Sequence, residues 1–288
     1  MKFGILAPYQ LGPLERGDYA SAFGKLVEEL GFESVWAVEH AVMCPDYEST
    51  YPYDPSGRSP FSERVIQPDP LIWLAYLAAT TTRLRLATGV LILPQHNPVP
   101  LAKTLASLDR LSGGRMLLGI GVGWVREEAV ALGTRFEDRG QRADEYVEVM
   151  RSLWREPVAS FDGEFVRFER VVSEPRPVRS EGVPIIVGGH SAAAARRAGR
   201  LGDGFYPLRV SDERLAFLRT TMQEAAAECG RDASTIEITC SGELTAPSAE
   251  HHLGLGVDRL VVFPPTGDLD ELRRLLEPLS REVIEKFA

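Results

Sequence analysis

The sequence has few of the features that mark secreted or metal-binding proteins. Only 3 cysteines occur in 288 residues, and they stand far apart at Cys44, Cys229 and Cys240. This spacing contains no CxxC pair and no zinc-binding pattern, so neither a disulfide framework nor a metal site is predicted. Reduced thiols are typical of cytoplasmic proteins, and we expect that location.

An excess of basic charge and long apolar runs are also missing. The formal net charge is −9, with 32 Lys and Arg against 41 Asp and Glu. This balance argues against nucleic acid and membranes as partners, because both need basic surface to neutralise phosphates. The start of the chain lacks the apolar core of a signal peptide, and the apolar run from Leu71 to Ala79 is too short to span a bilayer. A small anionic cofactor remains compatible, because it needs only local donors.

Short apolar runs alternate with helical patterns along the whole chain. The runs predict eight buried strands at residues 3–7, 34–38, 84–93, 116–120, 183–187, 204–206, 236–240 and 259–263. Helical spacing predicts helices at residues 19–30, 69–79, 99–111, 126–132, 139–154, 191–201, 212–229, 249–255 and 268–287. This alternation predicts one (β/α)8 TIM-barrel domain over residues 1–288. A doubly wound sheet is the weaker alternative, because Gly119 to Gly123 follows G-x-G-x-G and not the dinucleotide-binding G-x-G-x-x-G.

Two insertions interrupt the alternation. Residues 40–68, after the second strand, are rich in Pro, Tyr, Asp and Ser and predict a long loop that covers the site as a lid. Residues 157–184, before the fifth strand, contain Phe161 to Phe168, whose Asp-Gly pair predicts a hairpin turn.

Glycines are concentrated where strands three and four end. Gly89 follows Thr88 within a core strand, and Gly119, Gly121 and Gly123 end the next strand. The C-terminal ends of barrel strands form the site face. We therefore predict a flat slot there, nearly free of side chains and suited to a planar cofactor.

A further pair of glycines precedes a helix. Gly188-Gly189-His190-Ser191 leads into an alanine-rich run. Free amides and the helix dipole at such a point favour a phosphate group. Ser191 is predicted to cap the helix or to donate from its hydroxyl, and His190 either contacts the phosphate or faces solvent.

His40 is the candidate for proton transfer. It directly follows the second strand, and histidine titrates near neutral pH. Its neighbour Glu39 either orients the ring or packs inside the barrel. Trp124, at the tip of the fourth strand, is either a wall of the site or core packing. Glu127-Glu128 open a helix, where acidic residues favour the dipole.

Taken together, these motifs resemble the luciferase-like monooxygenase superfamily, and within it the branch that uses the deazaflavin coenzyme F420. The resemblance runs from Lys2 to about Phe263 and depends on the order and spacing of the motifs. They are Thr88 to Pro94, Gly119 to Trp124, Gly188-Gly189 and Asp203-Gly-Phe205.

The resemblance implies an oxidoreductase that transfers a hydride between F420 and a small organic substrate, with His40 as a catalytic residue; we expect its neighbour Glu39 to act with it. It also implies a non-prolyl cis peptide bond at Gly89–Val90, behind the cofactor ring. The implied cofactor-binding residues are Thr88, Gly89, Val90, Gly121, Val122, Gly123, Trp124, Gly188, Gly189, His190 and Ser191.

Other functions stay open at this stage. An FMN-dependent two-component monooxygenase of the bacterial luciferase type is the main alternative, and either enzyme would work with a separate F420 or flavin reductase. A barrel that carries or senses a flavin-like ligand is a third possibility. The family's sugar-dehydrogenase subgroup has a catalytic glutamate near the position of Trp124, so sugar phosphate oxidation is not expected. The family also implies a homodimer through residues 19–30 and 71–77, although helices that only face the barrel have the same pattern.

Overall fold

Parallel strands form a closed barrel at the centre of the molecule. The computed structural model describes residues 1–288. The barrel strands are β1 (Lys2–Leu6), β2 (Ser34–Ala37), β3 (Arg85–Thr88), β4 (Leu91–Ile92), β5 (Met116–Gly121), β8 (Ile185–Gly188), β9 (Gly204–Tyr206), β10 (Glu237–Ser241) and β11 (Arg259–Val262). The hydrogen-bonded order is β3, β2, β1, β11, β10, β9, β8, β5, β4, and a pairing of β3 with β5 closes the ring. Because β3 and β4 are two parts of one barrel strand, the predicted eight-stranded TIM barrel is confirmed.

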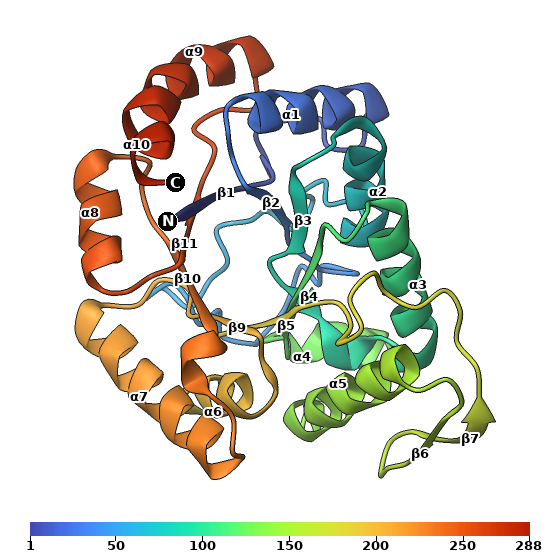
Figure 1. Ribbon diagram of the computed structural model, residues 1–288. Coiled ribbons are helices and arrows are strands. Elements are labelled where there is room, and N and C mark those ends of the chain that lie inside the picture. Colours follow the sequence, from blue (N-terminus) through green and yellow to red (C-terminus); the bar gives the residue numbers. More distant parts are fainter.

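Helices surround the barrel (Figure 1). They are α1 (Gly17–Glu29), α2 (Pro70–Thr80), α3 (Pro98–Leu111), α4 (Arg126–Ala131), α5 (Arg139–Arg155), α6 (Ala192–Leu201), α7 (Asp212–Glu228), α8 (Ala246–Gly254), α9 (Leu269–Leu279) and α10 (Glu285–Phe287), with short turns η1 (Leu93–Gln95), η2 (Ala233–Thr235) and η3 (Ser280–Ile284). The final predicted helix, 268–287, is divided at the π-helical turn η3, just after Pro278. Proline removes a helical hydrogen bond, which explains the interruption. No helix has the length and apolar character needed to cross a membrane.

Polar side chains fix where several helices begin. Asp69 accepts hydrogen bonds from the amides of Leu71 and Ile72 at the start of α2, both at 2.9 Å. Ser191 accepts from the amide of Ala194 at the start of α6. Such caps satisfy amides that have no partner within the helix. The predicted N-cap at Ser191 is therefore confirmed.

The predicted third strand, 84–93, is divided. It forms β3 and β4, with Gly89 and Val90 between them, and both parts pair with β5. The Gly89–Val90 peptide bond is cis, as the resemblance implied. The predicted hairpin is also present, as β6 (Ala159–Asp162) paired with β7 (Arg167–Val171).

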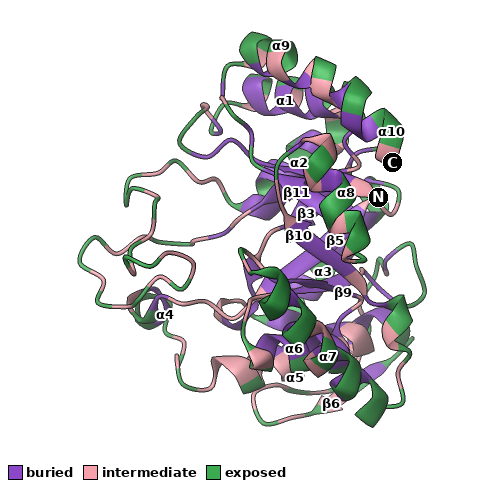
Figure 2. Cartoon of the chain, turned by 90° about the vertical axis from the view of Figure 1, so that its left-hand side faces the viewer, coloured by how far each residue is buried: buried purple, intermediate pink, exposed green.

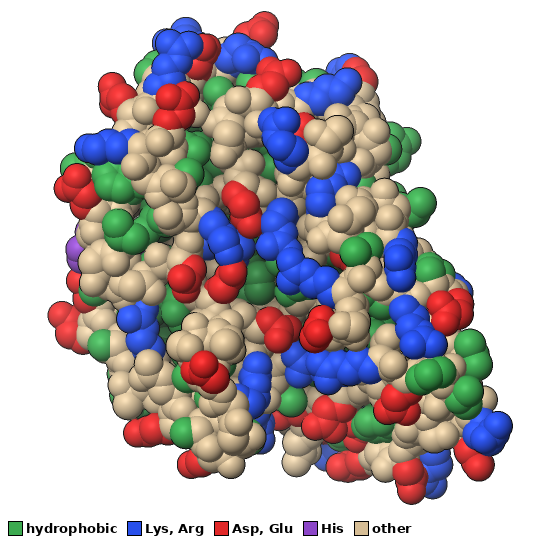
Figure 3. Space-filling model, in the orientation of Figure 1, with side chains coloured by type: hydrophobic (Ala, Val, Ile, Leu, Met, Phe, Trp, Pro, Cys, Tyr) green, Lys and Arg blue, Asp and Glu red, His purple; other side chains and the backbone are tan.

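A buried ionic cluster closes the barrel at the end that carries the termini. The Arg259 side chain is fully buried, with Nε 3.0 Å from Glu33 Oε2 and Nη2 3.2 Å from Glu237 Oε2. Burial alone would lower the pKa of Arg259, but the two carboxylates outweigh it and raise that pKa. Basic and acidic side chains mix across the centre of this face (Figure 3). The ion pairs with Glu33 and Glu237 offset the cost of burying the Arg259 guanidinium inside the barrel.

The long loops gather at the opposite end. Figure 2 shows them projecting together with α4, away from both termini, and largely exposed or half-buried. Residues 40–68, the predicted lid, belong to this group and form turns and bends without a helix or strand. The parallel strands begin at the end that carries the termini, so the loops lie at the C-terminal ends of the strands. The candidate residues converge there.

Candidate active site

His40 lies at this C-terminal end, where a carboxylate from α4 holds its ring. His40 Nδ1 is 2.8 Å from Glu128 Oε2, and the Glu128 side chain is completely buried. The second oxygen of Glu128 accepts hydrogen bonds from the amides of Ala41 (2.7 Å) and Val42 (3.3 Å). The Nε2 atom of His40 has no partner in the protein and is not sealed from the surface. It is therefore available to a ligand.

The prediction that Glu39 orients His40 is wrong. Glu39 Oε1 is 2.9 Å from His96 Nε2, and Oε2 accepts the amide of Ile92 at 2.6 Å. Successive side chains leave a strand on opposite sides, so Glu39 packs inside while His40 faces the lid. Burial would lower the pKa of His96, but the hydrogen bond and charge of Glu39 outweigh it and raise that pKa.

The lid loop, residues 40–68, is attached to α4 by a second carboxylate. Glu127 accepts hydrogen bonds from the amides of Glu48 (2.6 Å) and Ser49 (3.3 Å) and from the Ser49 hydroxyl (2.7 Å). The Ser49 hydroxyl in turn accepts from the amide of Arg126 at 2.9 Å. Two adjacent glutamates of one short helix thus hold two separate stretches of the lid.

A row of aromatic rings crosses the C-terminal end of the barrel, which we call its mouth. It runs from His40 to Trp124, Tyr51, Tyr53 and His190, with successive ring centroids 5.9, 5.1, 5.4 and 4.8 Å apart. All four contacts are edge-to-face, the favourable geometry for such pairs. We call these five residues the aromatic row. Burial raises the pKa of Tyr53 to about 12, which keeps its phenol neutral.

The predicted flat slot is filled in part by Val90. A Cβ on Gly121 would lie 2.5 Å from Val90 Cγ2, and one on Gly188 would lie 2.5 Å from Val90 Cγ1. A Cβ on Gly89 would meet the Trp36 ring at 2.9 Å. These glycines make room for neighbouring side chains, so the surface offered at this point is the half-buried isopropyl group of Val90.

Thr88 does not reach the mouth with its side chain. The side chain is fully buried, and its hydroxyl donates to the carbonyl oxygen of Gly119 at 2.7 Å. A Cβ on Gly119 would lie only 1.9 Å from the carbonyl oxygen of Thr88. The contact between Thr88 and Gly119 joins β3 to β5. The prediction that Thr88 contacts a cofactor is therefore wrong for its side chain.

The turn from Gly188 to Ser191 presents free donors. The amides of residues 190–193 donate to no acceptor in the protein. Gly189 has φ +119°, which favours glycine. The Nδ1 atom of His190 is buried without a partner. Burial and the charge of Arg214 lower the pKa of His190, so its ring is neutral near pH 7. The structure thus brings the predicted anion-binding groups together.

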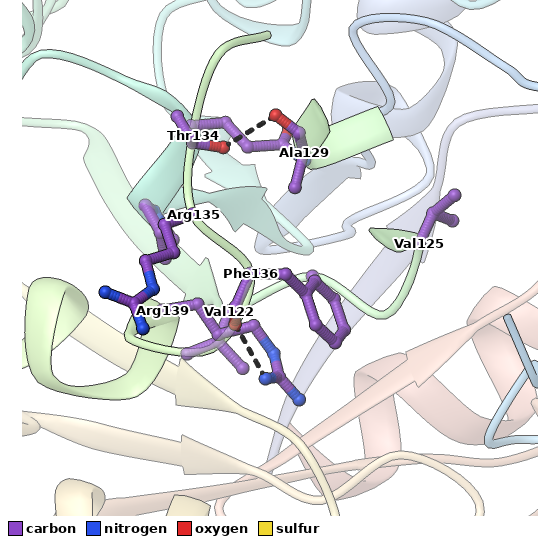
Figure 4. Close-up of a pocket in the computed structure, with 10 residues that line it drawn as sticks. Val122, Val125, Ala129, Thr134, Arg135, Phe136 and Arg139 are labelled. Atoms are coloured by element: carbon purple, nitrogen blue, oxygen red, sulfur yellow. Dashed lines mark hydrogen bonds between the residues drawn. The ribbon is translucent and has the colours of Figure 1, made fainter. Parts of the chain in front are cut away.

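Val122 and Gly123 line a small separate pocket beside the mouth (Figure 4). Its volume is about 10 Å³, which is room for one water molecule. Arg139 stacks on Phe136 there, with its guanidinium carbon 3.8 Å from the ring centroid, and its buried Nε has no partner. A planar tricyclic ring does not fit in this pocket, so the pocket itself gives no support for Val122 and Gly123 as cofactor-binding residues.

Comparison with known proteins identifies the family. Residues 1–250 match the family model described as luciferase-like monooxygenase. The chain therefore belongs to the luciferase-like monooxygenase family, and its class is that of an oxidoreductase.

Individual relatives carry more specific names. The F420-dependent glucose-6-phosphate dehydrogenase of Nocardia farcinica is 33% identical over 238 residues, which cover 79% of this chain and 67% of the relative. The monooxygenase RslO1 from Streptomyces bottropensis aligns over 100% of both chains with a TM-score of 0.79 and 23% identity. The coenzyme F420-dependent tetrahydromethanopterin reductase from Methanopyrus kandleri aligns over 100% of this chain and 99% of its own, with a TM-score of 0.76 and 16% identity. The two structures share the fold.

Sequence reasoning missed Glu128 and His96. Glu128 lies in the first turn of α4, where the helix dipole already explains an acidic residue. His96 follows η1 and carries no motif. The only available signal was their residue type, because the contacts to His40 and Glu39 span 88 and 57 positions of sequence.

Proposed function

We propose that the protein is an F420-dependent oxidoreductase that transfers a hydride to or from a small organic substrate. The observation that carries the proposal is the aromatic row, which joins a proton-transfer group at His40 to free helix amides beside His190. F420 combines a planar ring with a phosphate, so apolar contacts along the row and donors at its end match its chemistry. The 33% identical relative from Nocardia farcinica supports this choice of cofactor.

The residues present fit such a cofactor. The amides of residues 190–193 and the unpartnered His190 Nδ1 are donors for a phosphate. Val90, with Gly121 and Gly188 behind it, would contact the ring. When bound, the cofactor supplies or accepts the hydride. His40 gives or takes the accompanying proton at Nε2, and Trp124 and the lid tyrosines restrict water at the mouth.

Equilibrium binding under anaerobic conditions tests the choice of cofactor. We expect micromolar binding of F420 by calorimetry and binding of FMN weaker by about tenfold, or about 1.4 kcal/mol. With F420 bound, His40→Asn should lower turnover of enone, imine or alcohol substrates by about 10²–10⁴-fold without changing the affinity for F420. Tighter binding of reduced FMN than of F420 would contradict the proposal.

An FMN-dependent two-component monooxygenase is the second candidate. The family name and the full-length match to RslO1 favour it, and a helix start that binds the phosphate of F420 would also bind that of FMN. Such an enzyme needs a separate flavin reductase. Formation of an oxygenated organic product from O2 and reduced FMN, only when the protein is present and not with reduced F420, would establish this alternative.

We also propose that the protein forms a homodimer through α2. The large apolar residues of α1 are buried, whereas Ile72 and Tyr76 of α2 are 65% and 54% exposed. Ala75 and Ala79 lie on the same outward face, and a contiguous apolar face of this kind is typical of interfaces. Light scattering should give twice the chain mass of 31.8 kDa, and Ile72→Glu should shift it to the monomer. A monomeric wild-type protein would contradict this.

A further inference from the structure

The contact between His40 and Glu128 determines which nitrogen of the histidine carries a proton. Glu128 is completely buried on α4, and Oε2 lies 2.8 Å from His40 Nδ1. The other oxygen already accepts two backbone amides, from Ala41 and Val42. An ionised carboxylate only accepts hydrogen bonds. Nδ1 must therefore carry a proton, and the neutral ring keeps its lone pair on Nε2.

We infer that Glu128 is a positioning residue that fixes His40 as the Nδ1–H tautomer, with the Nε2 lone pair directed to the substrate. The inference rests on the proposed function, because it specifies how His40 exchanges protons there. Nε2 of His40 would accept the hydroxyl proton of an alcohol substrate, for which oxidised F420, when bound, would supply the hydride acceptor. In the reverse direction the imidazolium returns the proton from Nε2. The Glu128 carboxylate stabilises the imidazolium in both directions.

Trp124 supports the same orientation from a second side. Its ring meets the His40 ring edge to face, with centroids 5.9 Å apart and planes at 87°. The carboxylate fixes one ring nitrogen and the indole limits rotation of the ring. With the ring held on two sides, a rotation that would swap the positions of Nδ1 and Nε2 is disfavoured.

The same carboxylate couples the histidine to the lid. Ala41 and Val42 are the first residues of the lid after His40, and their amides share one oxygen of Glu128. Opening of the lid at this point would break the bonds that also align the ring. Glu128 thereby links the position of the proton-transfer group to closure over the substrate.

Glu127 provides a matched control within the same helix. It accepts three hydrogen bonds from Glu48 and Ser49 of the lid and has no contact with His40. Glu127→Gln and Glu128→Gln make the same chemical change at adjacent positions. Only Glu128→Gln places an amide N–H opposite Nδ1, because its remaining oxygen is needed by Ala41.

Nitrogen-15 NMR of histidine-labelled protein tests the inference, with the His40 signal assigned by its loss in His40→Asn. In the wild type at a pH where the ring is neutral, we expect a protonated Nδ1 and an unprotonated Nε2. Glu128→Gln should reverse the two assignments, and Glu127→Gln should leave them unchanged. A wild-type Nε2–H tautomer, or an unchanged tautomer in Glu128→Gln, would overturn the inference, and the wild-type spectrum decides even if the variant does not fold.

Turnover with F420 separates this inference from the proposed function. Glu128→Gln should lower turnover at least about 100-fold, within the usual contribution of general acid–base catalysis, with the Kd for F420 unchanged. A reversed tautomer with undiminished turnover would refute the positioning of His40 for chemistry. Absence of F420 binding in the wild type would refute the proposed function, while the NMR result would still decide the tautomer.

Discussion

The side chain of Val90 occupies the space that a side chain on Gly121 would need. A Cβ on Gly121 would lie 2.5 Å from Val90 Cγ2, far inside van der Waals contact. The two residues stand on neighbouring parts of the barrel wall, because Gly121 ends β5 and Val90 precedes β4. Glycine at position 121 thus sets where the Val90 isopropyl group lies at the mouth.

Gly121→Ala is expected to displace Val90 and to disturb the proposed ring contact. We predict a loss of affinity for F420 of about tenfold or more, and a loss of stability of about 1–3 kcal/mol, as is usual for overpacking. Calorimetry with F420 and urea unfolding measure the two effects. Gly254→Ala is the matched control, because a Cβ there meets no atom within 4 Å.

The double variant Val90→Ala/Gly121→Ala identifies the cause. Removing the two Cγ atoms of Val90 frees the space that the new methyl group at position 121 needs, so the double variant should regain most of the stability lost in Gly121→Ala. Neighbouring substitutions that share one space are expected to be strongly non-additive. Additive losses would show that Gly121 is required for another reason.

Ala192→Pro is predicted to weaken phosphate binding without unfolding α6. Residue 192 is the first position of α6, where proline is tolerated. Ser191 already has the extended conformation that proline requires of the preceding residue, with ψ 156°. The substitution removes one of the four free amides, so the Kd for F420 should rise about twofold to twelvefold, from the loss of about 0.5–1.5 kcal/mol.

A deazaflavin without the phosphate provides the control ligand. Its affinity should be equal in the wild type and in Ala192→Pro, because it makes no contact with the helix start. Ser191→Ala is the control variant, since it removes the cap and keeps the amides, and should cost about 1 kcal/mol of stability. Equal weakening of both ligands in Ala192→Pro would refute a phosphate site at this turn.

The sequence predicted the barrel because its strands are short, buried and apolar, and a helical segment follows each of them. Val90 lay inside the predicted strand 84–93 and was implied only by the family resemblance. His40 and the turn at Gly188 were located because each lies at the end of a predicted strand, and strand ends meet at one face. Strand length, apolar character and position at a strand end can all be predicted from residues that are neighbours in sequence.

Contacts between distant loops were not predictable in this way. His40 and Glu39 are adjacent in sequence, yet they pair with Glu128 and His96 respectively. The lid and α4 meet only after the barrel has closed, and many acidic residues of the chain were equally plausible partners. The partial filling of the flat slot was not predictable for a similar reason, because nothing in the sequence showed that Val90 would lie against Gly121 and Gly188.

The pair of Glu39 and His96 is predicted to make stability depend on pH above 6.5. The pKa of His96 is raised in the folded protein. A raised pKa contributes stability below the unfolded value, 6.5, and this contribution is lost as the pH rises through the folded value. Relative to His96→Gln, the wild type should be more stable by about 1.5–3 kcal/mol at pH 6, and by less at pH 9, in urea unfolding. A difference that does not change with pH would contradict a charged His96.

Arg259 is predicted to stabilise the barrel most at neutral pH. Burial would raise the pKa of Glu33, but Arg259 outweighs it and lowers that pKa below 4.5. A lowered pKa contributes stability above pH 4.5 that is lost as the pH falls through the folded value.

Arg259→Met leaves Glu33 and Glu237 without their buried partner, so it should cost about 3–5 kcal/mol at pH 7. The cost should shrink below pH 4.5, where protonation removes the carboxylate charges. Denaturant unfolding of both proteins between pH 3.5 and 7 measures this, and an equal cost at both ends would show that packing, not charge, accounts for the effect of Arg259.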